Sequence, residues 1–273
     1  MRDLHLGGEL AGGVLVAVAI FCATGALGAS SRVVNSFPAP SAHPCGLAFG
    51  NGILFVSDYE TKTIYRLNPE TGSALSSYVP SPLPDGNVYG LAFYGTRLWA
   101  NAARRDRACL YKMRPATGSV VASYVIAGLD AAEGIAFYGS YVYIGNNSPT
   151  DLYIYKFRPA TGTIVKSWPG GKYPGGLTVI THPDTEENVL LNSGTVDGWV
   201  YVDDLEGRRY EGYAFKIAVT CPWYQYRGDL AGRDGTHIFY ASDYFDHIYE
   251  LKINWLGGAV APTSLGRVKA LFR

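Results

Sequence analysis

Charged residues are scarce in this sequence, and neither sign is in excess. Only 17% of the 273 residues are charged, and 23 Lys and Arg residues balance 23 Asp and Glu residues. A nucleic-acid-binding domain needs clustered basic side chains to contact phosphates, and a polybasic membrane-surface protein needs a similar cluster. The composition argues against both classes, and we expect no nucleic-acid partner.

Common catalytic and cofactor motifs are also absent. The sequence contains no Gly-x-Ser-x-Gly, no Gly-x-Gly-x-x-Gly, no Walker sequence, no His-Glu-x-x-His and no EF-hand loop. The cysteines number only four and lack the Cys-x-x-Cys spacing of zinc knuckles. We therefore expect no bound cofactor and no metal site.

An apolar segment lies near the amino terminus. Residues 12–29 carry no charge, follow Arg2 and His5, and end in small residues, which is typical of a signal peptide cleaved near residues 28–30. The run is also long enough to cross a bilayer as a helix. Residues 1–30 are thus predicted to be either a cleaved signal peptide or a retained apolar helix that contacts a membrane through residues 10–29. Both alternatives place residues 31–273 outside the cytoplasm.

What the sequence has in abundance is internal repetition. Gly-Leu-Ala-Phe at residues 46–49 recurs 44 residues later at 90–93, and Gly-Ile-Ala-Phe follows after another 44 at 134–137. A second marker, Pro-x-Thr-Gly, ends at Gly72, Gly118 and Gly162. Each repeat predicts four short strands, with a turn in which Pro fixes φ and Gly accepts a positive φ. Four-stranded repeats of this length are typical of β-propeller blades.

Two further repeats are less regular. Residues 238–251 are similar in sequence to residues 54–67 and indicate a fifth unit. Residues 176–227, which lie between the third repeat and this fifth unit, form an irregular fourth unit. We therefore predict an all-β propeller over residues 31–273, with five blades of four antiparallel strands and six blades as the alternative.

Two segments compete to close the ring. Residues 32–40 resemble the fourth strands of the repeats and precede the first blade, so they can supply the outermost strand of the last blade. Residues 263–273 are the alternative. Closure removes a long unpaired edge, and whichever segment is spare could add to the sheet of a neighbouring subunit.

The repeat motifs resemble those of a known group of proteins. Gly-Leu-Ala-Phe, Leu-Phe-Val-Ser-Asp at 54–58 and Ile-Tyr-Arg-Leu-Asn-Pro-Glu-Thr-Gly at 64–72 resemble the extracytoplasmic propellers of the NHL, YVTN and SMP-30-like group. They are also similar to the five-bladed glutaminyl cyclotransferase type. The resemblance spans about residues 32–255 and implies the fold, whereas proteins with these repeats include binding proteins, lyases and lactonases.

The sequence departs from the resembled enzymes at their functional residues. The cyclotransferases place a catalytic Glu on the second strand of the first blade, where this chain has Val56-Ser57-Asp58. The SMP-30-like lactonases hold a divalent ion with carboxylate and Asn ligands at the channel mouth. In this chain, Glu133 is the only residue in a place comparable to one of those metal ligands.

The residues just before each opening glycine are predicted to line the mouth of the central channel. The predicted binding residues are His43, Cys45, Tyr89 and Glu133. Glu133 is the only carboxylate among them, and an apolar, aromatic mouth would favour its protonated form, so it is the candidate general acid or base. The structural alternative is that Glu133 caps the start of its strand.

Other side chains suggest modifications or ligands. His43, Cys45 and Glu133 have the chemistry of zinc ligands, while Cys45 is equally a candidate for a disulfide with Cys221. Asn146 begins an Asn-Asn-Ser sequon, which predicts a possible glycosylation site.

Two functions follow from these observations. The lack of a complete catalytic set and the Tyr-rich turns favour a non-enzymatic extracytoplasmic propeller that binds a partner or self-assembles into a surface structure. The expected partners are another copy, a surface protein or a glycan. The alternative is a channel-mouth enzyme of the lyase or glutaminyl cyclotransferase kind that uses Glu133.

Overall fold

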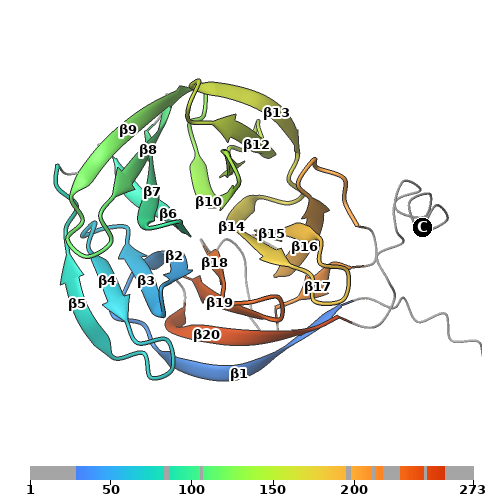
Figure 1. The fold of residues 1–273 in the computed structure, drawn as a ribbon, viewed down its shortest axis with the longest axis horizontal. Coiled ribbons are helices and arrows are strands. Elements are labelled where there is room, and N and C mark those ends of the chain that lie inside the picture. The colour runs from blue at the N-terminus through green and yellow to red at the C-terminus, as the bar shows by residue number, and fades with distance from the viewer. Residues whose placement is uncertain are drawn as a thin grey trace, which may run out of the picture.

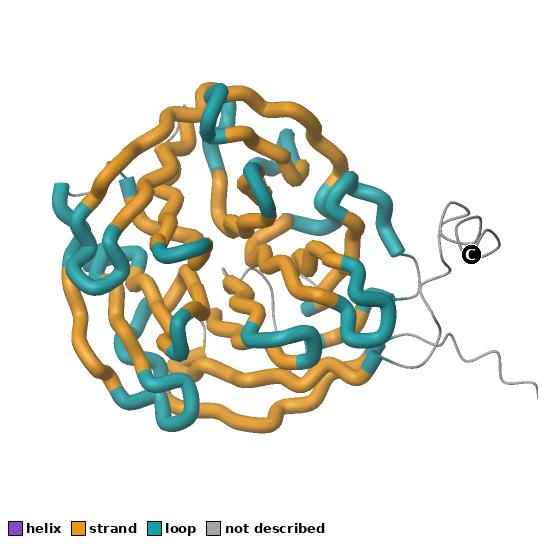
Figure 2. Tube along the Cα trace, viewed as in Figure 1, coloured by secondary structure: helices purple, strands orange, loops and turns teal. Residues whose placement is uncertain are grey.

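The fold consists of β-strands that surround a common axis. The computed structural model describes residues 29–82, 86–104, 107–194, 198–210, 213–217, 228–242 and 245–255, which form twenty strands joined by turns and loops (Figure 2). The strands make five sheets of four antiparallel strands each, arranged as blades around the axis (Figure 1). The predicted all-β, five-bladed propeller is confirmed.

The first three blades follow the repeats, with their strands in chain order from the axis outward. Blade 1 contains β2 (Pro44–Gly50), β3 (Ile53–Asp58), β4 (Ile64–Leu67) and β5 (Ala74–Tyr78). Blade 2 contains β6 (Asn87–Tyr94), β7 (Arg97–Arg104), β8 (Arg107–Met113) and β9 (Val120–Ala127). Blade 3 contains β10 (Ala132–Tyr138), β11 (Tyr141–Asn146), β12 (Tyr153–Arg158) and β13 (Thr163–Pro169).

The last two blades carry the irregularities of the sequence. Blade 4 contains β14 (Pro174–Thr181), β15 (Asn188–Gly194), β16 (Trp199–Asp204) and an outermost strand of two residues, β17 (Phe215–Lys216). Blade 5 contains β18 (Gly228–Gly232), β19 (His237–Ser242), β20 (Phe245–Asn254) and β1 (Ser30–Pro38). The diverged fourth unit of the sequence is therefore a complete blade with a short outer strand.

The predicted terminal segment lies outside this description. Residues 1–28, which include the apolar run, and residues 256–273, which include the alternative closing segment, are not among the described residues. Within the described ranges, none of the elements is a helix with the length and hydropathy needed to cross a membrane.

The hydrophobic core lies between the blades. Each of the five buried clusters combines side chains from two neighbouring blades. Between blades 1 and 2, the rings of Phe55 and Phe93 stack with centroids 5.8 Å apart, and between blades 5 and 1 the rings of Phe49 and Phe239 lie 5.7 Å apart. Because apolar burial is the main favourable term in folding, each blade depends on its two neighbours.

Aromatic residues of the outer strands pack on glycine turns of the next blade. The pairs are Phe37 over Gly72, Tyr78 over Gly118 and Trp168 over Gly207, and a Cβ on any of these glycines would overlap the ring. Gly118 also has a φ of 70°, as its turn requires. The Tyr78 hydroxyl donates a hydrogen bond to the Pro115 carbonyl oxygen at 3.1 Å. Each of these three rings follows a serine in the sequence, and each joins neighbouring blades.

We expect Gly118→Ala to destabilise the protein more than Gly162→Ala. Gly162 occupies the same kind of turn with a φ of 66°, but nothing lies within 4 Å of the position that a Cβ would take there. Gly162→Ala should cost only the left-handed backbone penalty of about 1–2 kcal/mol, whereas Gly118→Ala should add an overpacking cost of about 1–3 kcal/mol. Urea unfolding of both variants measures the difference. Equal losses would contradict the interlocking role of Tyr78.

The ring closes through the amino-terminal strand. β1 pairs with β20 in antiparallel register from Ser30 opposite Asn254 to Pro38 opposite His247. Of the two candidate segments, the amino-terminal one therefore supplies the outermost strand of the last blade. The sheet of blade 5 therefore combines the first and the last of the described strands.

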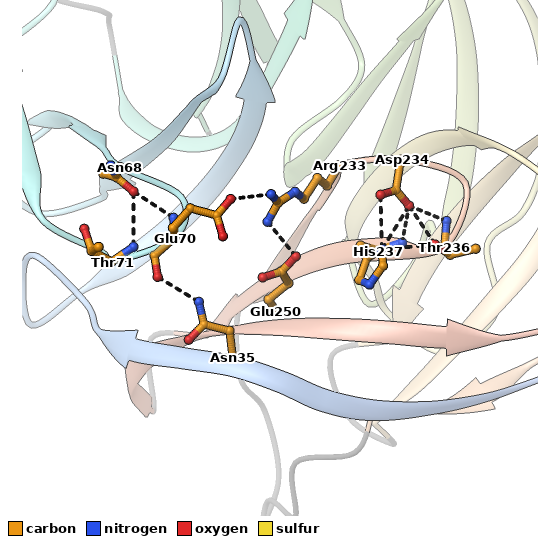
Figure 3. Close-up of polar contacts among 9 residues, drawn as sticks. All are labelled: Asn35, Asn68, Glu70, Thr71, Arg233, Asp234, Thr236, His237 and Glu250. Atoms are coloured by element: carbon orange, nitrogen blue, oxygen red, sulfur yellow. Dashed lines mark hydrogen bonds and ion pairs between the residues drawn. The ribbon is translucent and has the colours of Figure 1, made fainter.

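A polar network reinforces this junction (Figure 3). Arg233 of blade 5 donates through Nη1 to Glu250 Oε1 on β20 at 2.8 Å and through Nη2 to Glu70 of blade 1. Asn35 on β1 donates to the Glu70 carbonyl oxygen at 3.0 Å. The Glu250 side chain is 7% exposed and that of Glu70 is 61% exposed. Arg233 is therefore the partner of one buried carboxylate and one exposed carboxylate.

We expect Arg233→Met to destabilise the fold much more than Glu70→Gln. Removing the guanidinium leaves the buried Glu250 charge without this partner, which costs about 3–5 kcal/mol for buried pairs. Loss of the exposed Glu70 charge should change stability by about 1 kcal/mol or less. Chemical denaturation of both variants provides the comparison. Similar small losses would show that Arg233 does not stabilise the closure.

Candidate functional site

The innermost strands of blades 1–4 share a β-bulge at the opening glycine. The register shifts between Pro44 and Leu47 in blade 1 and between Val88 and Leu91 in blade 2, with equivalent shifts in blades 3 and 4. A bulge removes a backbone group from the ladder, and a side chain of the second strand accepts the released glycine N–H. The acceptors are Ser57 Oγ for Gly46 at 2.9 Å, Asn101 Oδ1 for Gly90 at 2.5 Å and Ser193 Oγ for Gly176 at 2.9 Å.

Glycine is required at the bulge because neighbouring innermost strands approach closely there. A Cβ on Gly46 would lie 2.5 Å from the Tyr89 carbonyl oxygen, and a Cβ on Gly90 would overlap the Glu133 carbonyl oxygen. The residues that precede the opening glycines are thus brought side by side around one end of the channel. This arrangement agrees with the mouth predicted from the spacing of the repeats.

Blade 5 replaces the opening glycine with Asp229, and this carboxylate lies at the axis. Asp229 is 2% exposed. Its Oδ2 accepts the N–H of Leu47 at 2.8 Å and of Leu91 at 3.4 Å. Its Oδ1 accepts the N–H of Leu230 at 2.8 Å and of Leu177 at 3.3 Å. Burial raises the pKa of the Asp229 carboxyl well above its usual range, and these four N–H groups oppose that rise.

Asp229 is not among the predicted site residues, although the sequence contains a signal for it. Gly-Asp-Leu-Ala at 228–231 matches Cys-Gly-Leu-Ala at 45–48, with Asp in place of the repeated Gly. The fifth unit was recognised only from residue 238 onward. The position at which this strand differs from the other four is the one that is glycine in the repeat motif.

A small cavity continues along the axis on the side of Asp229 away from the mouth. It has a volume of about 80 Å³ and is lined by three successive residues from each innermost strand, such as Leu47, Ala48 and Phe49. Each innermost strand pairs with only one neighbour, so the other edge of its backbone faces the axis. Asp229 separates this cavity from the mouth.

Glu133 is anchored at the mouth by an amide. Asn147 Nδ2 donates to Glu133 Oε2 at 2.8 Å, and the Glu133 side chain is half-buried. The approach to Glu133 is fixed through Ala131, whose N–H is accepted by Asn146 Oδ1 at 3.1 Å and whose carbonyl oxygen accepts the Asn147 N–H at 2.8 Å. These contacts orient one carboxylate oxygen at the start of β10.

His43 and Tyr89 meet through a residue that the sequence analysis did not assign to the site. The Tyr59 ring contacts the His43 ring edge-on at 5.3 Å and stacks with the Tyr89 ring at 6.4 Å. The His43 imidazole also lies 3.4 Å from the Glu60 carboxylate. The mouth therefore has an aromatic wall made by His43, Tyr59 and Tyr89 next to the strand that carries Glu133.

The remaining predicted residues have different outcomes. Cys45 is 4% exposed, so its thiol lies below the surface of the mouth. Cys221 lies outside the described residues, so the disulfide stays a prediction. Among the residues that the structure describes, no three His, Cys, Asp or Glu side chains gather closely enough to hold a metal ion.

The prediction of a glycosylation site at Asn146 is wrong, because the side chain of Asn146 is buried. Asn146 is fully buried, and its Nδ2 donates to Asp151 Oδ2 at 2.8 Å. A glycan on Nδ2 would have no room in the folded protein. The sequon is explained instead by the hydrogen bonds that Asn146 makes to Ala131 and Asp151.

Solved structures share this fold, while sequence comparison finds no match to a family model or to a curated protein. Myxococcus xanthus glutaminyl cyclase has a TM-score of 0.62 at 14% identity, covering 83% of this chain and 97% of that chain. PQQ-bound aldose sugar dehydrogenase from Streptomyces coelicolor has a TM-score of 0.50 at 16% identity, covering 83% and 98%. A luciferin-regenerating enzyme has a TM-score of 0.50 at 12% identity, covering 84% and 96%. The resemblance to the glutaminyl cyclotransferase type is confirmed at the level of the fold.

These neighbours correct the main functional prediction. The sequence analysis favoured a non-enzymatic propeller that binds a partner or self-assembles, whereas all three neighbours are enzymes by name. That prediction is wrong, and its alternative, a channel-mouth enzyme, fits the neighbours better. Identities of 12%, 14% and 16% support no particular activity.

Proposed function

We propose that the protein is an enzyme that transfers protons at the mouth of the propeller channel, with Glu133 as general acid and base. The proposed reaction is of the lyase or glutaminyl cyclotransferase kind. The observation that supports it is the hydrogen bond of 2.8 Å from Asn147 Nδ2 to Glu133 Oε2. A carboxylate oriented by an amide at the mouth of the channel is suited to general acid–base catalysis.

The surroundings of Glu133 support binding of a small substrate. Asp229 blocks the axis below the mouth, so a substrate would enter and leave on the same face. The aromatic wall of His43, Tyr59 and Tyr89 offers ring faces on which apolar or planar groups can pack. The similarity to glutaminyl cyclase makes an amino-terminal glutaminyl peptide the first substrate to test.

The chemistry of glutaminyl cyclisation needs one proton-transfer group. The α-amino nitrogen attacks the γ-carboxamide carbon, a new C–N bond forms, and the bond to the amide nitrogen breaks to release ammonia. In the proposed reaction, Glu133 takes a proton from the attacking nitrogen and gives it to the leaving nitrogen, so that its own charge is restored at the end. A β-elimination would use the same carboxylate to remove a proton from carbon and return it to the leaving group.

The location of the protein is part of the proposal. The uncharged run at residues 12–29 supports a location outside the cytoplasm, either after cleavage or with the segment retained. The prediction of a surface protein or glycan as a partner stays untested.

We expect Glu133→Gln to lower kcat by at least about 100-fold, because general acid–base groups typically contribute 10²–10⁴-fold. The assay measures ammonia release from glutaminyl peptides, with ester, lactone and elimination substrates tested in parallel. Asn147→Ala should give a smaller loss, since it leaves the carboxylate in place. Glu186→Gln is the matched control, because Glu186 is an exposed carboxylate in the β14–β15 turn, at the other end of the innermost strand.

Two outcomes would contradict the proposal. One is a Glu133→Gln variant with wild-type turnover of a substrate that the protein converts. The other is no turnover of any tested class by a folded wild-type protein that includes residues 31–273.

A further inference from the structure

The hydrogen bonds of Asp229 resemble those of a bound anion. Each carboxylate oxygen accepts two backbone N–H groups, and an ionised carboxylate offers about four lone-pair sites in total. Three of the four donors, Leu47, Leu91 and Leu177, belong to other blades. None of the ion pairs found within the described ranges involves Asp229. The carboxyl oxygens of Asp229 are therefore held by backbone dipoles.

The four donors require an acceptor at the axis. They lie on the strand edges that face the channel, where no further strand can pair with them. The same four leucines line the axial cavity. A neutral amide in place of the carboxylate would turn its NH₂ group toward at least one N–H group. The ring of donors therefore favours a small group with two acceptor oxygens and a negative charge.

The repeat also shows how the site can be vacated. Four blades have glycine at this position, namely Gly46, Gly90, Gly134 and Gly176. Asp229→Gly would restore the common pattern and remove a side chain whose heavy atoms are those of acetate. The cavity adjoins the vacated volume and gives a small molecule a place from which to reach the N–H groups.

We propose that the inward N–H groups of Leu47, Leu91, Leu177 and Leu230 form a binding site for a small carboxylate, which the chain fills with its own Asp229. The site is separate from the proposed catalytic mouth, and it does not depend on any activity of Glu133. Formate and acetate are the ligands it should accept once the internal carboxylate is removed.

Chemical rescue of full-length Asp229→Gly tests the proposal. Its Tm should be lower than that of the wild type, and formate or acetate replacing chloride at constant ionic strength should raise it in a saturable way. Pivalate, which has the same charge but a bulkier group, should not. Asp229→Asn is the matched control, because its side chain fills the site, so formate should leave its Tm unchanged.

The rescue has clear contrary results. An equal effect of formate and pivalate on Asp229→Gly, or an equal effect of formate on Asp229→Gly and Asp229→Asn, would overturn the proposal. If Asp229→Gly does not fold in chloride, refolding from denaturant in formate should recover folded protein. Failure to fold in formate as well would also count against the site.

A second measurement uses the fact that all four donors are leucines. In protein labelled with ¹⁵N-leucine, the amide proton signals of Leu47, Leu91, Leu177 and Leu230 should move upfield together in Asp229→Asn, because a charge-assisted hydrogen bond is lost. Formate added to Asp229→Gly should move them back toward their wild-type positions. Unchanged signals in Asp229→Asn would show that the carboxylate charge is not what these donors bind.

Discussion

The hydrogen bonds between Asp229 and the inward N–H groups fix the arrangement of the innermost strands. Each innermost strand pairs on one side only, so its other edge faces the axis (Figure 1). Unpaired buried donors cost about 1–3 kcal/mol each, and the axis is too narrow for another strand. One carboxylate satisfies four donors from blades 1, 2, 4 and 5 at once. The interblade core and the β1–β20 pairing surround the strands that Asp229 connects.

The hydrogen bonds to Asp229 require one blade to have a residue other than the repeated glycine at this position. The close approach at the bulges leaves no space for a Cβ at Gly46, Gly90 or Gly134, so most blades must have glycine there. An axis with five glycines would leave the donors without a partner from the chain. One blade therefore has to supply the acceptor, and the blade that closes the ring does so. Blade 5 thus supplies both the β1–β20 pairing at the outer edge of the ring and the Asp229 carboxylate at the axis.

The sequence predicts those parts of the fold that repeat, because each repeat is an independent observation of the same local physics. The Gly-Leu-Ala-Phe and Pro-x-Thr-Gly spacings predict the blades, and the likeness of residues 32–40 to other outer strands makes them one of two candidates for the closing strand. Asp229 was missed because it differs from the repeat. Asn146 was misjudged because a three-residue motif carries no information about burial, and Tyr59 was missed because a turn residue gains its partners only when two blades meet.

Blade 3, which carries Glu133, differs from its neighbours in two physical respects. Its second strand has Gly145 at the position where blades 1, 2 and 4 have Ser57, Asn101 and Ser193. Gly145 has no side chain that could accept the N–H of the opening glycine. The four donors to Asp229 also come from the other blades. The start of β10 is positioned instead by the Ala131 contacts with residues 146 and 147. In the proposed reaction, the position of the Glu133 carboxylate therefore depends on contacts at the mouth and not on the hydrogen bonds to Asp229.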